Sequence, residues 1–513
     1  MSILLRKFQR FKKIFPNKEE KDFVRMNPLN YKKKNGEKIV LIEMTENIYF
    51  IVNLYFLLKN KIFENKKIIG LWIWPIHRKK GFKALLSFLF DYFINYFIKL
   101  KWIKIYKHLG IYQVIDFNNN FRDNMFVGKS NFIENNSKLK NKKSVLNIRL
   151  EGIRIGDLIY DHYLRFFGDV TFDLKNTLIN KRLLTIFEGS NNNLNNFYNK
   201  HKKQIEYYIP QSAVYLNGLA IRYFINKNIK TIGGVRHDAY VSKFTKQDFL
   251  ESRRCQTVKQ DFKKIKNKTE KINFTKENLK KKFQGKKNKE SYYLKHSPYN
   301  KKKLFKIKKN FDVIIFLPDF SDAPHAYGNF VFDDFFHWIH ETLEFLKLNN
   351  LTVAIKEHPN AWIYSSTLFL KELKIKYKKL VWLSKHISNK AIFNKKPKFG
   401  ISPHGTVLHE LAYHKIIPIA AGPNPYMSYN FVFTPKNKKD YFSLIMRASQ
   451  KKLHLKKNFK KEIAECYYMY FLNNNDCLKT QARNANIKDY LPSVGGKGVY
   501  DILKRFNEGF FSK

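Results

Sequence analysis

The sequence has little cysteine, little glycine and proline, and few acidic residues. Its 513 residues include three cysteines, Cys255, Cys466 and Cys477, and no two of them form a CxxC pair. A sparse, odd count excludes a disulfide scaffold, a zinc ribbon and iron–sulfur spacing, and it favours a reducing compartment. Only 21 glycines and 15 prolines accompany visible excesses of lysine, asparagine and isoleucine, which are residues of A- and T-rich codons.

The charge balance is strongly positive. Lysine and arginine total 97 against 42 acidic residues, for a formal net charge of +55. Such a balance indicates a nucleic-acid or anionic-membrane partner, or it reflects codon drift. An apolar fraction of 44 % excludes a wholly disordered chain. The length predicts about two to four domains.

No long apolar run is present. The most apolar stretch, Ala84 to Ile98, contains Asp91 and Asn95, and it is shorter than the ~20 residues that cross a bilayer. We therefore expect no transmembrane segment.

The first residues do not read as a signal peptide, because charges surround their apolar side chains and no small-residue cleavage site follows. Leu4, Phe8, Phe11 and Phe15 fall at helical spacing among basic residues. This pattern predicts either an interfacial amphipathic helix on anionic lipid or a packed terminal helix.

The first part of the chain reads as alternating strands and helices after a basic extension over 1–35. Strands are expected at 39–44, 68–74 and 103–106, with a helix at 47–58 between the first two. This rhythm predicts a parallel sheet with helices on both faces, forming an N-terminal Rossmann-like domain over 36–284. Near its end, Thr275 is a candidate N-cap of a short helix.

A second unit of the same type follows a lysine-rich linker at 285–310. The C-terminal Rossmann-like domain is expected over 311–451, and a helical tail over 452–513. Its predicted strands are 311–318, 351–359, 380–383, 399–402 and 416–420, with helices at 333–348 and 406–414. Two such doubly wound units facing a cleft are the expected architecture.

Polar loops follow four of these strands. In open α/β sheets, ligands bind outside the carboxyl ends of the strands, so converging loops predict a site. The loops are Asp319-Phe320-Ser321-Asp322-Ala323-Pro324-His325, Lys356-Glu357-His358-Pro359, Ser402-Pro403-His404-Gly405-Thr406 and the segment 421–426.

The third loop suggests a phosphate site. Gly405 lets the backbone approach a ligand at a helix start, where free N–H groups favour an anion. Lys356 and His358 could add charge-assisted contacts. Glu410, one turn further along, could accept hydrogen bonds from a ribose. The alternatives are an ordinary cap by Ser402 or Thr406 and a solvent-facing Glu410.

Metal and nucleotide-loop motifs are not matched. His409 and His414 are five residues apart, whereas a zinc-protease helix needs histidines four apart. The run from Gly495 to Gly498 lacks P-loop spacing. We expect no metal site and no cofactor.

The C-terminal unit resembles GT-B glycosyltransferases. Ser402-Pro403-His404-Gly405-Thr406, then Glu410-Leu411-Ala412, Pro418 and Ala421-Gly422 are similar to the donor-binding helix of that fold. The resemblance implies that Gly405 and Thr406 hold a diphosphate and that Glu410 holds a ribose. Lys356, His358 and Pro359, with Ser402, resemble bacterial capsule polysaccharide biosynthesis proteins. The acidic pair followed by glycine of the sialyl type is missing, which leaves the donor open.

The resemblance implies a cytoplasmic glycosyltransferase, either free or peripheral on the inner face of the cytoplasmic membrane. It would move a sugar from a nucleotide-sugar to a surface glycan of capsule or O-antigen type on a lipid-linked acceptor. The donor would lie on the C-terminal unit, with His404, His358 and Lys356 stabilising the leaving group without a metal.

The catalytic acid or base is left open by the sequence. Candidates from the N-terminal unit are Glu43, Glu46, Asp157 and Asp161, and candidates from the other side are Asp322 and His325. The alternative functions are a nucleotide-sugar epimerase or polyol-phosphate transferase of the same fold, a basic nucleic-acid-binding protein, and an inactive scaffold.

Overall fold

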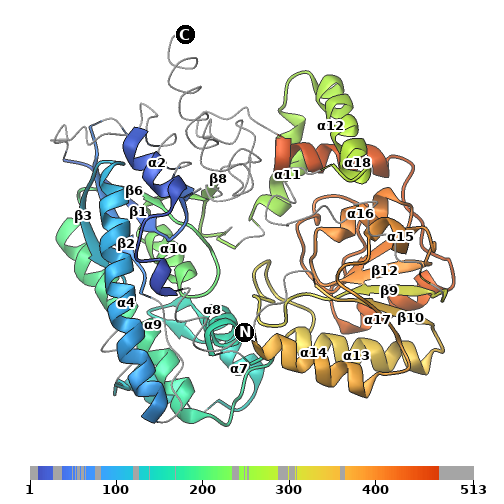
Figure 1. Ribbon diagram of the computed structural model, residues 1–513, viewed down its shortest axis with the longest axis horizontal. Coiled ribbons are helices and arrows are strands. Elements are labelled where there is room, and N and C mark those ends of the chain that lie inside the picture. The colour runs from blue at the N-terminus through green and yellow to red at the C-terminus, as the bar shows by residue number, and fades with distance from the viewer. Residues whose placement is uncertain are drawn as a thin grey trace.

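The structure is a computed structural model of the chain. It describes residues 10–26, 37–74 and 242–286 with short gaps, 82–118, 126–233 apart from 138 and 168, 299 and 307 singly, 309–358 and 364–472. The chain forms two α/β units side by side (Figure 1), each built on one largely parallel sheet.

The N-terminal sheet has the strand order β3-β2-β1-β6-β7-β8, in which only β8 is antiparallel to its neighbour. Because β1 lies in the middle and the order reverses beside it, the first five strands have a Rossmann-type 3-2-1-4-5 arrangement. The strands are β1 (Ile39–Met44), β2 (Lys67–Trp72), β3 (Ile111–Asp116), β6 (Ile205–Ile209), β7 (Lys230–Gly233) and β8 (Ser242–Phe244).

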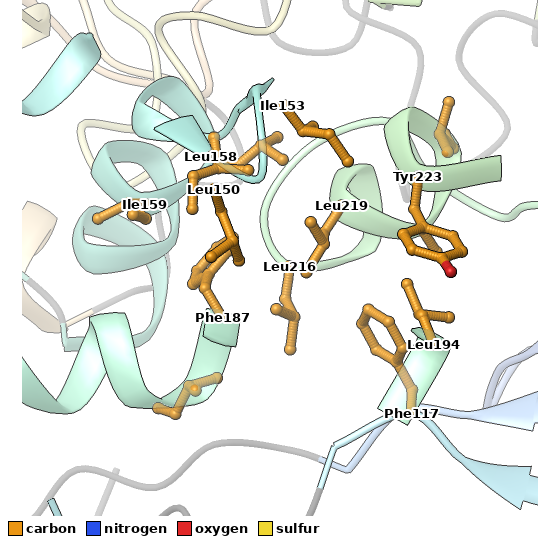
Figure 2. Close-up of a cluster of buried hydrophobic side chains, with 14 of the residues drawn as sticks. Phe117, Leu150, Ile153, Leu158, Ile159, Phe187, Leu194, Leu216, Leu219 and Tyr223 are labelled. Carbon is orange, nitrogen blue, oxygen red and sulfur yellow. The ribbon is translucent and has the colours of Figure 1, made fainter. Parts of the chain in front are cut away.

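Both faces of this sheet are covered, as continuous apolar strands require. Alternate residues of β1 enter separate cores: Leu41 packs with helices α8, α9 and α10, whereas Val40 packs with α2 and α4. Figure 2 shows the first core, where side chains of the three helices meet. The helices are α2 (Lys18–Met26), α4 (Phe82–Lys107), α8 (Gly156–His162), α9 (Thr177–His201) and α10 (Asn217–Asn226).

The strand predicted at 103–106 is wrong, because α4 continues through these residues and the third strand is β3. Trp102, Ile105 and Tyr106 are buried at helical spacing and pack on the sheet. Gly110, with φ of +81°, turns the chain between α4 and β3.

The C-terminal sheet is wholly parallel, in the order β11-β10-β9-β12-β13. It has the same 3-2-1-4-5 order, so the predicted pair of doubly wound, Rossmann-type domains is confirmed. Its strands are β9 (Val313–Phe316), β10 (Val353–Lys356), β11 (Val381–Leu383), β12 (Phe399–Ser402) and β13 (Ile417–Ala420). Its helices are α13 (Phe335–Leu348), α14 (Tyr364–Lys376), α15 (Asn389–Phe393), α16 (Val407–Tyr413) and α17 (Lys438–Ser449).

A helical layer joins distant parts of the sequence on the C-terminal unit. Helices α11 (Arg253–Lys263) and α12 (Lys268–Phe283) pack against α18 (Phe459–Tyr467). The helix start predicted at Thr275 is wrong: this residue lies inside α12, where its hydroxyl donates to the carbonyl of Lys271.

The domain limits stay predictions. The linker expected at 285–310 and the tail beyond residue 472 lie largely outside the described residues. Among the helices that the structure describes, none is both long and apolar enough to cross a membrane.

Candidate functional site

Polar side chains of the two units meet beyond the carboxyl end of β9. The loop 317–334 carries Asp319, Asp322 and His325 toward the N-terminal unit. Arg165 Nη1 lies 3.9 Å from a carboxylate oxygen of Asp319, and the hydroxyl of Tyr215 donates to Asp322 at 2.6 Å. This edge is the reversal point of the C-terminal strand order, where ligands bind in such sheets.

Asp161 and His325 form a close contact across this junction. Nδ1 of His325 lies 2.6 Å from Oδ1 of Asp161, and the backbone N–H of His325 donates to Oδ2 at 3.2 Å. Both residues are buried, and Nε2 of His325 has no hydrogen-bond partner among the described residues. An aspartate that fixes one ring nitrogen leaves the other available to exchange a proton.

Burial and mutual attraction set the charges of this pair. Burial raises the pKa of Asp161 to about 6, although His325 opposes the shift. Burial lowers the pKa of His325, but Asp161 and Asp157 outweigh it and the net shift is upward. Shifted pKa values of this kind, in a pair of buried groups between two units, are typical of functional sites.

Close helix packing positions Asp161. A Cβ on Gly156, at the start of α8, would lie 2.0 Å from the carbonyl oxygen of Val145, so only glycine permits this approach. The helix continues as a π-helical segment, η2 (Tyr163–Phe167), which carries Arg165. Such π-turns are frequent at functional sites.

Glu43 holds the segment that presents Tyr215. Its buried carboxylate accepts hydrogen bonds from the backbone N–H of Gln211 at 3.0 Å and from the side chain of Asn217. Tyr215 lies between them with φ of +57°, a conformation that costs about 1–3 kcal/mol in a non-glycine residue. Glu43 thus has a positioning role.

Asp157 forms a buried ion pair. Its two carboxylate oxygens accept hydrogen bonds from Arg222 at 2.7 and 2.6 Å. Burial alone would raise the pKa of Asp157, but Arg222 lowers it below the usual value. Catalytic roles for Glu43, Asp157, Asp322 and His325 stay predictions.

The turn after β12 lies close to Asp322. A Cβ on Gly405 would lie 2.7 Å from Oγ of Ser402, so a side chain there would displace the Ser402 hydroxyl. Thr406 precedes α16 but makes no side-chain cap. Helix α16 has only seven residues. Its dipole therefore supports anion binding less strongly than the close approach of the backbone at this turn.

The two predicted histidine ligands are neutral at neutral pH. Burial lowers the pKa of His404 to about 4, against the pull of Asp322, and it also lowers the pKa of His358, against Asp319 and Asp322. The His404 ring packs against Tyr327 and Phe335, and its Nδ1 has no partner in the described part of the chain. Both rings can serve as hydrogen-bonding groups rather than cations.

Lys356 and Glu410 belong to a buried network behind the turn. Lys356 donates to Asn389, whose Nδ2 donates to Glu410 at 2.9 Å. Glu410 also pairs with Lys282 at 2.9 Å and accepts from the hydroxyl of Tyr299 at 2.5 Å. Glu410 is thus neither solvent-facing nor open to a ligand in this arrangement, and its ribose contact stays a prediction.

Neighbouring groups stabilise the ionised form of Glu410 in this network. Burial would raise the pKa of Glu410, but Lys282, His409 and Tyr299 lower it to about 2. Burial lowers the pKa of Lys356 to about 8, although Glu410 attracts its proton.

The structure brings together most of the predicted loop residues. Asp322, His325, His358 and His404 meet near the junction, whereas Lys356 and Glu410 lie in the network. Pro359 falls outside the described residues.

Several members of the site have no signal in the sequence, because no motif marks a partner that folding brings from a distant segment. The sequence predicts Asp161 as a candidate base but does not predict its pairing with His325. The missed residues are Arg165, Tyr215, Lys282, Tyr299 and Asn389.

No group of three or more histidine, cysteine, aspartate or glutamate side chains in the described residues is placed to hold a metal ion.

Comparisons with known proteins are weak. No family model matches the sequence, and no curated protein matches it. HepE of Anabaena, solved with UDP and glucose, aligns at 10 % identity and a TM-score of 0.24, covering 93 % of this chain and 100 % of that one. The catalytic domain of starch synthase IV from Arabidopsis thaliana, bound to ADP and acarbose, aligns at 10 % identity and a TM-score of 0.27, covering 95 % and 78 %. At these scores the fold assignment rests on the strand order of the two sheets.

Proposed function

We propose that the protein is a glycosyltransferase that moves a sugar from a nucleotide-sugar to an acceptor hydroxyl. The Asp161–His325 pair carries the proposal, because it places an oriented imidazole where the loops of one Rossmann-type unit meet the other. The C-terminal unit would bind the donor, and the N-terminal unit would bind the acceptor.

The donor diphosphate would lie against the turn at Gly405, where a backbone without a side chain can approach phosphate oxygens. His404 and His358 would supply hydrogen bonds. Arg165, whose side chain is 27 % exposed beside Asp319, would supply the positive charge that neutral histidines lack.

His325 would act as the general base. Nε2 would take the proton of the acceptor hydroxyl as the acceptor oxygen forms its bond to the anomeric carbon. The bond from that carbon to the phosphate oxygen would break, and the nucleoside diphosphate would leave with the electron pair. The Asp161 carboxylate would stabilise the imidazolium that forms. Attack opposite the leaving group would invert the anomeric centre.

The acceptor is proposed to be a bacterial surface glycan on a lipid carrier, with the protein acting at the inner membrane face. The resemblance of Lys356, His358 and Pro359 to capsule polysaccharide proteins supports this class of acceptor.

Ligand-induced stabilisation tests the donor site. Thermal unfolding of the full chain would be followed with UDP, CMP, CDP, GDP and ADP, and a ligand at a hundred times its dissociation constant adds about 2.7 kcal/mol. We expect one nucleotide to stabilise the protein and Gly405→Ala to reduce that effect. Folded protein that responds to none of them would contradict the proposal.

A further inference from the structure

One face of α4 exposes an unusual number of aromatic side chains. Phe90, Phe93, Tyr96 and Phe97 are 43, 61, 44 and 49 % exposed, and Leu100 is 37 % exposed. At 100° per residue these positions fall within one third of the helix circumference. They form a continuous apolar stripe, which we call the α4 face.

The opposite side of α4 packs against the sheet and holds the helix in the fold. Ile94, Ile98 and Trp102 are buried in the core beneath the sheet. The α4 face is therefore surplus to folding, and large exposed apolar patches usually mark interaction sites. Figure 1 shows α4 along the side of the N-terminal unit that lies away from the C-terminal unit.

The surroundings of the α4 face are basic. Lys104 and Lys107 are exposed and continue the stripe toward the helix end. The helix as a whole carries five lysines and one aspartate.

The N-terminal segment adds similar residues beside α4. Arg10 donates at 3.0 Å to Asn95, a buried residue on the side of α4 opposite the α4 face, so the segment contacts the helix away from the stripe. Phe11 and Phe15 are 45 and 62 % exposed, and Lys12 and Lys13 between them are also exposed.

We propose that the α4 face docks on an anionic lipid bilayer. Aromatic and leucine side chains would enter the headgroup boundary, and Lys104 and Lys107 would contact anionic headgroups, as in interfacial amphipathic helices. A second copy of the chain fits less well, because two chains that each carry a net charge of +55 repel one another. The proposal involves neither nucleotide nor sugar, so it stands apart from the proposed transferase activity.

Vesicle flotation of the full chain tests the docking. The probes are vesicles of phosphatidylcholine alone and of phosphatidylcholine mixed with phosphatidylglycerol. We expect flotation with the anionic vesicles and much less with the neutral ones. Replacing Lys104 and Lys107 by glutamine should lower the partition coefficient about thirtyfold, at about 1 kcal/mol per lysine.

Exposed positions allow a matched control for the apolar part. Phe93→Ser with Phe97→Ser should lower partitioning by about tenfold or more, because each phenylalanine loses its burial in the interface. The control is Leu348→Ser with Ile375→Ser, two exposed apolar side chains on the C-terminal unit that are 79 and 75 % exposed. All variants should keep the circular dichroism spectrum of the parent.

Three results would overturn the proposal. The first is partitioning that the control pair reduces as much as the Phe93 and Phe97 pair. The second is a dimer of the parent chain in sedimentation analysis that becomes a monomer when Phe93→Ser and Phe97→Ser are combined, with no flotation of any variant. The third is binding to RNA, rather than vesicles, that the Lys104 and Lys107 pair abolishes.

Discussion

Oδ1 of Asp161 lies 2.6 Å from Nδ1 of His325, although 164 positions separate the two residues in the chain. One belongs to a helix of the N-terminal unit and the other to a loop of the C-terminal unit. The pair therefore exists only when the two units are in contact, which makes it a sensitive probe of their arrangement.

Replacing Asp161 by asparagine should lower the pKa of His325. Burial lowers this pKa, and the Asp161 carboxylate is the main group that raises it. Titration of the histidine ring protons by NMR measures this shift directly. If His325 is the base, sugar transfer should fall by about a hundredfold or more. The pH at which activity rises should move down with the pKa of the ring. An unchanged His325 titration would show that the contact is absent in solution.

Glu410→Ala should destabilise the protein by about 3–5 kcal/mol, because the buried charge of Lys282 would lose the carboxylate that pairs with it. Urea unfolding measures the loss. Glu410→Gln with Lys282→Met removes both charges and should unfold at a higher urea concentration than Glu410→Ala. Equal stability of parent and Glu410→Ala would contradict the ion pair. A loss of nucleotide binding in Glu410→Ala alone thus does not identify a ribose ligand.

Gly405→Ala should displace the Ser402 hydroxyl within the turn, because the new Cβ would lie 2.7 Å from its Oγ. Ser402→Ala removes that oxygen and serves as the matched background. Isothermal titration with the stabilising nucleotide should show weaker binding by Gly405→Ala and recovery in the double variant. If the double variant binds as poorly as Gly405→Ala, the added methyl group itself blocks the phosphate.

Lys356 should make stability depend on pH above neutrality. Its folded-state pKa is about 8 and its ordinary value is 10.5, so between these values the unfolded chain binds a proton that the folded chain does not. The free energy of unfolding should therefore rise with pH across this window, by about 3 kcal/mol at most at ~1.4 kcal/mol per pKa unit. Lys356→Met should lose this slope in urea unfolding curves measured at several pH values. A slope that persists in the variant would assign it to other groups.

Much of the fold could be predicted, because buried parallel strands have an unmistakable composition. The strands predicted at 39–44 and 399–402 coincide with β1 and β12. The strand predicted at 103–106 is wrong because a run of four residues is too short to show whether its apolar side chains repeat as in a strand or as in a helix. These residues continue the long helix that precedes them. Strand ends could also be predicted, and with them the convergence of Asp322, His325 and His404. The partners of Glu410 could not, because Lys282 and Tyr299 come from segments with no recognisable pattern.

The contacts of Asp334 with both units affect how the chain assembles. One of its oxygens caps α13 by accepting from the backbone N–H of His337 at 3.0 Å, and the other accepts from Tyr160 at 2.7 Å and Thr171 at 2.6 Å in the N-terminal unit. A C-terminal fragment made alone would expose this carboxylate without its second set of donors. During synthesis the N-terminal half emerges first, so it can serve as the template on which the later half completes its packing.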